Sequence, residues 1–256
     1  CDWSSDVCSS DLAKLLRCVC VLLAVTGAAP RAFSADDPVA VALLAKLKAA
    51  RTDLEYSLPR QSAVPGLYEV SVKGGPTLYV SADGAYFVAG DLFAVGPGGF
   101  TNLAEQKRDA DRRSALAAIK PADMIVFAPP NPKATITVFT DVDCGYCRKF
   151  HKEVPQLNAM GIAVHYLAFP RAGLGSSSFR KIATAWCSPD RGAMLTRMKN
   201  GEDVPENVCD GNPVAAQYAL GEQLGVTGTP ALVLEDGTLI PGYQPADELA
   251  RLLGVK

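Results

Sequence analysis

The sequence has no excess of charge of either sign: 25 lysine and arginine residues stand against 27 aspartate and glutamate residues, a formal net charge of −2. Without a net positive field, a protein has little to attract nucleic acid or an anionic membrane surface. We therefore expect no nucleic acid among its partners. The sequence also has no phosphate-binding loop, no dinucleotide-binding fingerprint, no internal repeat and no low-complexity tract. What remains is a chain of 256 residues, 48% hydrophobic, long enough for one or two globular domains.

Histidine is scarce, with His151 and His165 the only two. A zinc site needs further ligands at close spacing, and Cys187 and Cys209 do not form a second Cys-x-x-Cys pair beside Cys144 and Cys147. The sequence thus predicts neither a metal site nor another cofactor. A cysteine–histidine protease pair is also disfavoured, because His151 lies two helical turns beyond Cys144.

No apolar run reaches the roughly 20 residues that a membrane-spanning helix needs, so we expect no stable membrane insertion. Residues 13–35 instead show a short basic region, an apolar stretch and a small-residue exit, which is typical of a secretory signal peptide. Cleavage is expected near Ser34 or Ala35, with Ala28 or Ala29 as the alternative, and a retained anchor is the less favoured interpretation. Residues 1–12 resemble a translated cloning adapter, and we leave them out of the fold.

Removing this leader takes away four of the eight cysteines and leaves Cys144, Cys147, Cys187 and Cys209. An even number of cysteines in an exported chain indicates disulfides in an oxidising compartment. Four cysteines permit three pairings. The two-residue gap makes Cys144 and Cys147 the natural redox pair, which leaves Cys187 and Cys209 for a structural disulfide.

The hydrophobic pattern changes along the chain and predicts two domains. Residues 36–100 combine a helix over 38–51 with short strands separated by glycine-rich turns, which predicts a small α+β domain. Residues 101–121 are charged and rich in alanine, and we predict an exposed linker helix there. A basic patch for a partner is the weaker alternative, because acidic residues interrupt it. The predicted strands of the first domain cover 67–72, 77–80, 85–88 and 91–95.

Residues 122–256 follow an α/β pattern. It predicts strands over 124–127, 135–139 and 162–169, a hairpin over 231–240, and helices over 144–157, 213–224 and 247–253, with mostly helical structure over 176–208.

The segment Cys144-Gly145-Tyr146-Cys147 lies where a predicted buried strand meets a predicted helix. The nucleophile in disulfide exchange is a thiolate, and the N–H groups and dipole of a helix N-terminus stabilise such an anion at Cys144. The spacing places Cys147 one turn away, where it can displace a substrate captured by Cys144. Gly145 is expected to let the turn open, and Tyr146 to help set the redox potential.

Several residues around the motif have two interpretations. Asp141 or Asp143 is either a proton-transfer acid or a capping or solvent-exposed residue. Arg148 and Lys149 are more simply exposed helix charges than groups that tune the redox potential. Thr229-Pro230 lies directly before a predicted strand. Together with the upstream cysteine pair, this predicts a cis peptide bond beside the redox centre, although most X–Pro bonds are trans.

At this level of detail the chain resembles the DsbC/DsbG family of periplasmic disulfide isomerases, and glycine at 145 favours the DsbC type. The resemblance covers essentially the whole chain after the leader. The matching segments are TITVFTDVDCGYCRKFH (135–151), GIAVHYLAFPR (161–171), AWCSPD (185–190) and LGVTGTPA (224–231), continuing to Gly242-Tyr243.

The resemblance implies a C-terminal thioredoxin-like α/β domain with a helical insertion and a small cystatin-like N-terminal dimerisation domain, giving a V-shaped homodimer. By position, Cys144 corresponds to the attacking thiolate, Cys147 to the resolving thiol, Thr229 and Pro230 to the cis-proline loop, and Cys187 and Cys209 to a non-catalytic disulfide.

The implied function is isomerisation or reduction of misoxidised exported proteins in the periplasm, with a DsbD-like membrane reductase keeping the cysteine pair reduced. Two alternatives remain, a net dithiol oxidase of the same fold and a dimeric periplasmic chaperone.

Overall fold

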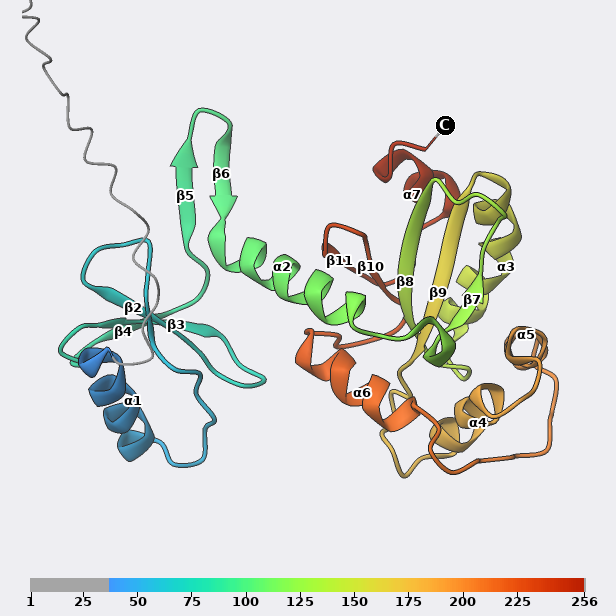
Figure 1. Cartoon of the computed structure of the whole chain (residues 1–256), viewed down its shortest axis with the longest axis horizontal. Coiled ribbons are helices and arrows are strands. Elements are labelled where there is room, and N and C mark those ends of the chain that lie inside the picture. Colours follow the sequence, from blue (N-terminus) through green and yellow to red (C-terminus); the bar gives the residue numbers. More distant parts are fainter. Residues whose placement is uncertain (1–36, 256) are drawn as a thin grey trace, which may run out of the picture. The chain divides into compact units, whose positions relative to one another are not determined.

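The computed structural model describes residues 37–255. The adapter-like segment predicted over 1–12 and the signal peptide predicted over 13–35 lie outside the described residues. The first elements are α1 (Pro38–Ala50), β1 (Arg60–Gln61), β2 (Leu67–Ser71), β3 (Thr77–Ser81), β4 (Phe87–Ala89), β5 (Phe93–Gly96), β6 (Gly99–Asn102) and α2 (Leu103–Ala117) (Figure 1).

Strands β1 to β4 form an antiparallel sheet in sequence order, covered by α1. Alternate residues of β2, Tyr68 and Val70, are buried against Ala40 and Leu43 of α1, as expected for a sheet with one face on a core. The sequence did not predict β6, which pairs with β5 in a separate two-stranded ribbon. Gly99 permits the tight connection between these strands because its φ of +108° is a conformation that other residues rarely adopt.

The remaining elements are the 3₁₀ turn η1 (Pro121–Asp123), β7 (Ile125–Phe127), β8 (Ala134–Thr140), α3 (Gly145–Ala159), β9 (Ile162–Ala168), α4 (Ser177–Trp186), α5 (Arg191–Lys199), α6 (Val214–Gln223), β10 (Ala231–Val233), β11 (Leu239–Pro241) and α7 (Ala246–Leu252). The strands form one sheet in the order β11-β10-β8-β9-β7. Only β8 and β9 run parallel, and α3 connects them. This is the thioredoxin-like arrangement that the sequence predicted.

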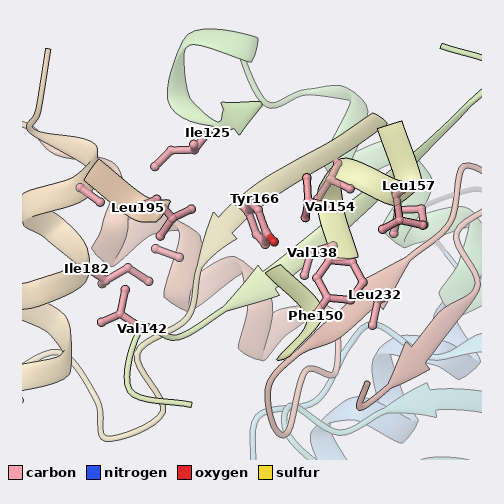
Figure 2. Close-up of a cluster of buried hydrophobic side chains, with 14 of the residues drawn as sticks. Ile125, Val138, Val142, Phe150, Val154, Leu157, Tyr166, Ile182, Leu195 and Leu232 are labelled. Atoms are coloured by element: carbon pink, nitrogen blue, oxygen red, sulfur yellow. The ribbon is translucent and has the colours of Figure 1, made fainter. Parts of the chain in front are cut away.

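The central strands are buried on both faces, and alternate side chains enter different cores. Val138, Tyr166 and Leu232 point toward α3 and α7 and contact Phe150, Val154 and Leu157 (Figure 2). Their neighbours in sequence contribute to a second cluster on the opposite face, beside α6, formed by Phe139, Leu167, Ala231 and Val233 with Leu224 and Val226. Burial on both faces accounts for the continuous apolar runs in the sequence.

Helix α2 is not a fully solvated linker, and the prediction of an exposed helix is wrong at Arg112. This arginine is 4% exposed; its Nε donates to the carbonyl oxygen of Leu224 at 3.1 Å. Its Nη1 forms ion pairs with Glu105 at 2.7 Å and Asp109 at 2.8 Å. A buried arginine is stable only when its donors are paired. The two ion pairs lie within α2, and the hydrogen bond to Leu224 holds this helix against the segment that follows α6.

The segment predicted to be mostly helical over 176–208 contains two helices, after which residues 200–213 form no regular element. Gly201, with φ of +85°, follows α5, and Pro205 prevents further helix by lacking an N–H group. A disulfide between Cys187 and Cys209 ties this segment to the end of α4, with the Cα atoms 5.6 Å apart.

Removing this disulfide is expected to lower stability without affecting thiol chemistry at Cys144. Its sequence separation is 22 residues, and for loops of this size the loss of chain constraint is worth about 2–4 kcal/mol. The double variant Cys187→Ala/Cys209→Ala should therefore unfold at lower denaturant concentration than the native protein, while Cys144 alkylates at an unchanged rate. An unchanged unfolding midpoint would contradict this expectation.

Candidate active site

Cys144 occupies the N-cap of α3, directly after the loop that follows β8. Its φ and ψ of −84° and 120° are extended, and its side chain makes no capping bond to the helix. The sulfur therefore lies beside the free N–H groups of the first helical turn, where a negative charge is favoured. The thiol donates to the carbonyl oxygen of Thr229 at 3.2 Å.

The pairing of β10 with β8 brings Thr229 and Pro230 to the cysteines, although they are more than 80 residues apart in sequence. Ala231 is opposite Phe139 in the antiparallel register, so Pro230 lies next to the end of β8. The Thr229-Pro230 peptide bond is cis. The structure thus brings together four of the predicted residues, Cys144, Cys147, Thr229 and Pro230. Cys187 and Cys209 form a disulfide with each other and are not part of this group.

Hydrogen bonding lowers the pKa of Cys144 to about 5. The largest contribution is a hydrogen bond from the Cys147 thiol. Burial acts in the opposite direction and raises the pKa. Smaller decreases come from the Thr229 side chain, the Cys147 N–H and the charge of Arg171. The Thr229 hydroxyl is buried without a partner of good hydrogen-bond geometry among the described residues, yet it is close enough to the sulfur to stabilise its anion. A pKa this low favours the thiolate of Cys144 at neutral pH, a form in which the sulfur no longer donates to Thr229.

Burial raises the pKa of Cys147, and its hydrogen bond to Cys144 raises it further. The side chain is 1% exposed. The charge of Lys199 and the Thr140 hydroxyl act in the opposite direction and favour the Cys147 anion. The two cysteines thus differ sharply: the pKa of Cys144 is lowered, and that of Cys147 is raised.

Asp141 is a structural residue rather than a proton-transfer acid. Burial alone would raise its pKa, but hydrogen bonds lower it below the ordinary value: Ser178 Oγ donates at 2.6 Å, and the N–H groups of Arg171 and Asp143 donate at 2.9 Å. Asp143 is more exposed and pairs with Lys181 at 3.0 Å. Asp141 does not cap α3, because the N-cap of that helix is Cys144 and none of the donors to Asp141 belongs to its first turn.

His151 is fully occupied by structural contacts. Its Nδ1 is 3.0 Å from the Tyr166 hydroxyl and its Nε2 is 3.0 Å from Thr196 Oγ1. Burial, and secondarily the charge of Lys199, lowers its pKa to about 4. A neutral histidine with both ring nitrogens engaged does not serve as a base for Cys144.

The remaining motif residues face outward. Tyr146 is 65% exposed and stacks on Tyr243, with ring centroids 6.4 Å apart. Lys149 Nζ lies 4.2 Å from the centroid of the Tyr243 ring, and Arg148 Nε donates to the carbonyl oxygen of Val142 at 2.9 Å. A Cβ atom at Gly145 would meet nothing within 4 Å, so the reason for glycine there is not steric.

Three contributors escaped the sequence analysis: Arg171, Thr140 and Lys199. Arg171 lowers the pKa of Cys144 by its charge, and Thr140 and Lys199 act on Cys147. Thr140 is one residue of a buried strand, and nothing in the sequence distinguishes it from its neighbours. Lys199 lies in a helix, and no local sequence pattern indicates where that helix lies relative to the motif. Only a basic residue amid an otherwise apolar face could have signalled Lys199.

Within residues 37–255, no three histidine, cysteine, aspartate or glutamate side chains are grouped as a metal site would require. Nor does this part of the chain contain a helix whose length and apolar character would allow it to cross a membrane.

Comparison with known proteins gives two family matches. Residues 32–105 match the disulfide bond isomerase protein N-terminal domain, and residues 121–255 match a thioredoxin-like domain. Thiol:disulfide interchange protein DsbC of Escherichia coli (strain K12) is 38% identical over 219 residues, covering 86% of this chain and 88% of the relative. DsbC of Salmonella typhimurium (strain LT2) is 39% identical over 219 residues, covering 86% and 87%. A crystal structure of a disulfide interchange protein from Neisseria gonorrhoeae is 34% identical, covers 53% of this chain and 96% of that one, and has a TM-score of 0.48.

Proposed function

The chain belongs to the DsbC family of thiol:disulfide interchange proteins, and is by that membership a disulfide isomerase; we propose that Cys144 is its attacking thiolate and Cys147 its resolving thiol. We further propose Gly145 and Tyr146 as the variable part of the redox motif, Thr229 and Pro230 as the substrate-facing loop, and Cys187–Cys209 as a structural disulfide.

The proposed reaction begins when the Cys144 thiolate attacks one sulfur of a substrate disulfide. A bond forms between Cys144 and that sulfur, the substrate S–S bond breaks, and the other substrate sulfur leaves as a thiolate. In isomerisation, another thiolate of the substrate then attacks the mixed disulfide, forms a new substrate disulfide and releases Cys144. In reduction, Cys147 displaces the substrate instead.

The observation that carries this assignment is the opposite shift of the two cysteine pKa values. A nucleophile must be ionised at working pH, and the pKa of Cys144 is lowered to about 5. A resolving thiol must stay protonated until needed, and burial raises the pKa of Cys147. No other described pair of side chains combines these properties.

A pH titration of thiolate absorbance at 240 nm tests the assignment. The reduced protein is expected to show a transition near pH 5 that is absent from Cys144→Ala. Cys147→Ala should raise the midpoint, because the largest stabilising hydrogen bond is lost, and Cys147→Ser should raise it less, because serine keeps a hydroxyl donor. A midpoint near the ordinary thiol value of about 8.5 would contradict the proposal.

The same shift predicts how the stability of the reduced protein depends on pH. Because the pKa of Cys144 is lower in the folded state, its contribution is present above the ordinary thiol pKa and is lost as pH falls toward about 5.

A recess that includes Thr229, whose carbonyl oxygen contacts Cys144, offers a place for substrate. It is lined by the backbone-rich segment 225–229 and by residues of β10 and β11, including Ala231 and Leu239. Glycines at 225, 228 and 242 leave its peptide groups open to an extended chain. We propose misfolded or misoxidised exported proteins as substrates, with little sequence preference because backbone contacts dominate.

The proposed setting is the periplasm, reached after removal of a signal peptide over 13–35. An isomerase must have its cysteine pair reduced in order to attack a substrate disulfide. In an oxidising compartment this state needs a continuing supply of electrons. We therefore propose a DsbD-like membrane thiol reductase as partner.

We also propose three parts of the chain. Residues 36–100 are the dimerisation domain, residues 101–121 are the linker, and residues 122–256 are the catalytic domain.

Exposed apolar residues in the first domain support a homodimer. All three residues of β4 and all four of β5 are exposed, although both strands are largely apolar. The exposed fractions reach 67% at Val88, 81% at Val95 and 79% at Phe100. An open edge strand and a high density of exposed apolar side chains are features that association normally covers. We propose that a second copy of this chain covers them.

The two alternative activities each have an observation in their favour. A chaperone that holds unfolded chains would use the cleft of the proposed dimer, so it depends on the same dimerisation through the first domain. A stabilised thiolate at Cys144 favours the reduced form of the pair and so makes its disulfide a stronger oxidant, which suits a net oxidase. The resting state in vivo separates the latter from an isomerase: an isomerase rests reduced, and an oxidase rests as the disulfide.

A further inference from the structure

Lys199, the last residue of α5, is buried under the cysteine pair. The side chain is among the largest that are fully buried, with 2% of the residue exposed. Its Nζ donates to Thr140 Oγ1 at 2.6 Å and to the carbonyl oxygen of Asp141 at 2.8 Å. Both acceptors belong to the end of β8 and the loop that leads to Cys144, so the ammonium is attached to the backbone that carries the redox motif.

A buried ammonium is costly unless it is paired, and both of these acceptors are uncharged. Among residues 37–255, no carboxylate lies within ion-pair distance of Lys199; that of Asp141 is held by Ser178 and Arg171. Lysine at this position thus gives up an ion pair that buried lysines normally need. Packing alone would be served better by an apolar residue of the same length.

The charged and titratable groups around Lys199 come from several elements. Cys144 lies at the N-terminus of α3, and Cys147, Arg148 and His151 lie within it; Asp141 follows β8, and the Tyr166 hydroxyl of β9 contacts His151. Burial lowers the pKa of Lys199 to about 8, whereas Cys147, Asp141 and Cys144 act in that order to raise it. His151 is neutral. The first among the groups that favour the charged lysine is therefore Cys147.

Thr140 connects the lysine to the sulfur. Its hydroxyl, which is fully buried, accepts from Lys199 through one lone pair, and this leaves its own proton free to point elsewhere. The Thr140 side chain is also close enough to Cys147 to favour its anion, which lowers the pKa of that thiol. The hydroxyl proton of Thr140, which the bond from Lys199 does not use, is therefore available to the Cys147 sulfur.

We propose that Lys199 is a positioning residue for the resolving step: it orients the Thr140 hydroxyl toward Cys147 and stabilises the Cys147 thiolate while that sulfur attacks the mixed disulfide. In this step the Cys147–Cys144 bond forms and the bond between Cys144 and the substrate sulfur breaks. The proton lost by Cys147 ends on the departing substrate thiol, so the reaction needs no additional oxidant or reductant. The proposal depends on the roles assigned above to Cys144 and Cys147.

This role has a consequence for the balance of activities. Burial makes ionisation of Cys147 unfavourable, so the mixed disulfide persists and the substrate has time to rearrange. Because Lys199 favours the Cys147 thiolate, it shortens the lifetime of the mixed disulfide. It thereby sets how often a substrate leaves by reduction before it isomerises.

The two steps are separated when reduced protein reacts with an equimolar amount of 5,5′-dithiobis(2-nitrobenzoate). Attack by Cys144 releases the first nitrothiobenzoate, and resolution by Cys147 releases the second, both followed at 412 nm. In Lys199→Met, the second phase should be about tenfold slower at pH 7, as for a one-unit rise in the pKa of Cys147. The first phase should change less than about threefold, and the pH profile of the second phase should move to higher pH.

Thr140→Val and Thr140→Ser provide a second pair of variants. Valine removes the hydroxyl while keeping the shape and should slow the second phase, whereas serine should retain most of its rate. Lys152→Met removes an exposed lysine of α3 and serves as the control for loss of one positive charge. Because valine tests the hydroxyl that Lys199 is proposed to orient, the proposal stays testable if Lys199→Met does not fold.

The proposal is overturned if the second phase is unchanged in Lys199→Met and Thr140→Val, or if both phases slow equally. Failure of the underlying assignment gives a different result: the native protein itself would then show no second release, or Cys144→Ala would still show a rapid first one.

Discussion

Replacing Cys144 by alanine is expected to abolish catalysed reactivation of a scrambled multi-disulfide substrate. The native thiolate is formed at neutral pH because its pKa is lowered to about 5, whereas the remaining thiol of Cys147 is buried and has a raised pKa. Nothing else among the described residues can supply the nucleophile, since Cys187 and Cys209 are joined to each other. We expect a loss on the order of a hundredfold or more, to the uncatalysed rate.

The measurement is the recovery of substrate activity over time in a glutathione buffer, with equal amounts of native protein and variant. Cys147→Ala serves as the matched variant: it retains the attacking sulfur and should accumulate mixed disulfides visible on a non-reducing gel. Suppression of substrate aggregation, measured in parallel, should be unaffected by Cys144→Ala. If reactivation is instead unimpaired in Cys144→Ala, the catalytic role is wrong and the chaperone alternative remains.

Placing a carboxylate on each of two exposed apolar strands of the first domain is expected to convert a dimer into a monomer. Val88 of β4 and Phe100 of β6 are the sites, with 67% and 79% of each residue exposed. In the double variant Val88→Asp/Phe100→Asp, a dimer would have to desolvate four charges, two from each copy. Burial of unpaired charge costs several kcal/mol per ion, so we expect dissociation to become at least about a hundredfold more favourable.

Sedimentation analysis measures the oligomeric state, and two activity assays measure its consequence. The monomer should exchange thiols with a small disulfide at nearly the native rate, because none of the cysteine contacts involves this domain. Isomerisation of a protein substrate should fall strongly, because a single catalytic domain has no second surface to hold the chain. Leu252→Asp, at an exposed apolar position of α7, is the control and should remain dimeric. A double variant that is still dimeric would place the interface elsewhere.

Local sequence patterns anticipated most elements because their causes are local. The alternation in 67–71 and the apolar runs of 134–140 and 162–168 reflect burial on one or two faces, and the observed strands lie within a few residues of the predicted ones. The errors have equally local causes. Strand β6 was missed because its four residues include Gly99 and no alternation, and residues 200–213 are not helical because of Gly201 and Pro205.

The site was only partly accessible in this way. Cys144 and Cys147 are recognisable because disulfide exchange needs two sulfurs one turn apart at a helix start, and Thr229-Pro230 because proline constrains the backbone before a strand. The groups that adjust these sulfurs carry no comparable pattern. Arg112, assigned to a solvated helix, is buried, and Lys199 is one of three basic residues in a helix of mixed composition.

The sequence by itself determined the type of fold and the family of this protein, and it predicted which sulfurs react. Only the tertiary structure decided how the two sulfurs differ. A pKa depends on the dielectric, donors and charges within a few ångströms, and at Cys144 and Cys147 these come from β8, α5 and the loop before β10, segments that meet only when the sheet is assembled. The motif supplies two identical thiols, and the fold lowers the pKa of one and raises the pKa of the other.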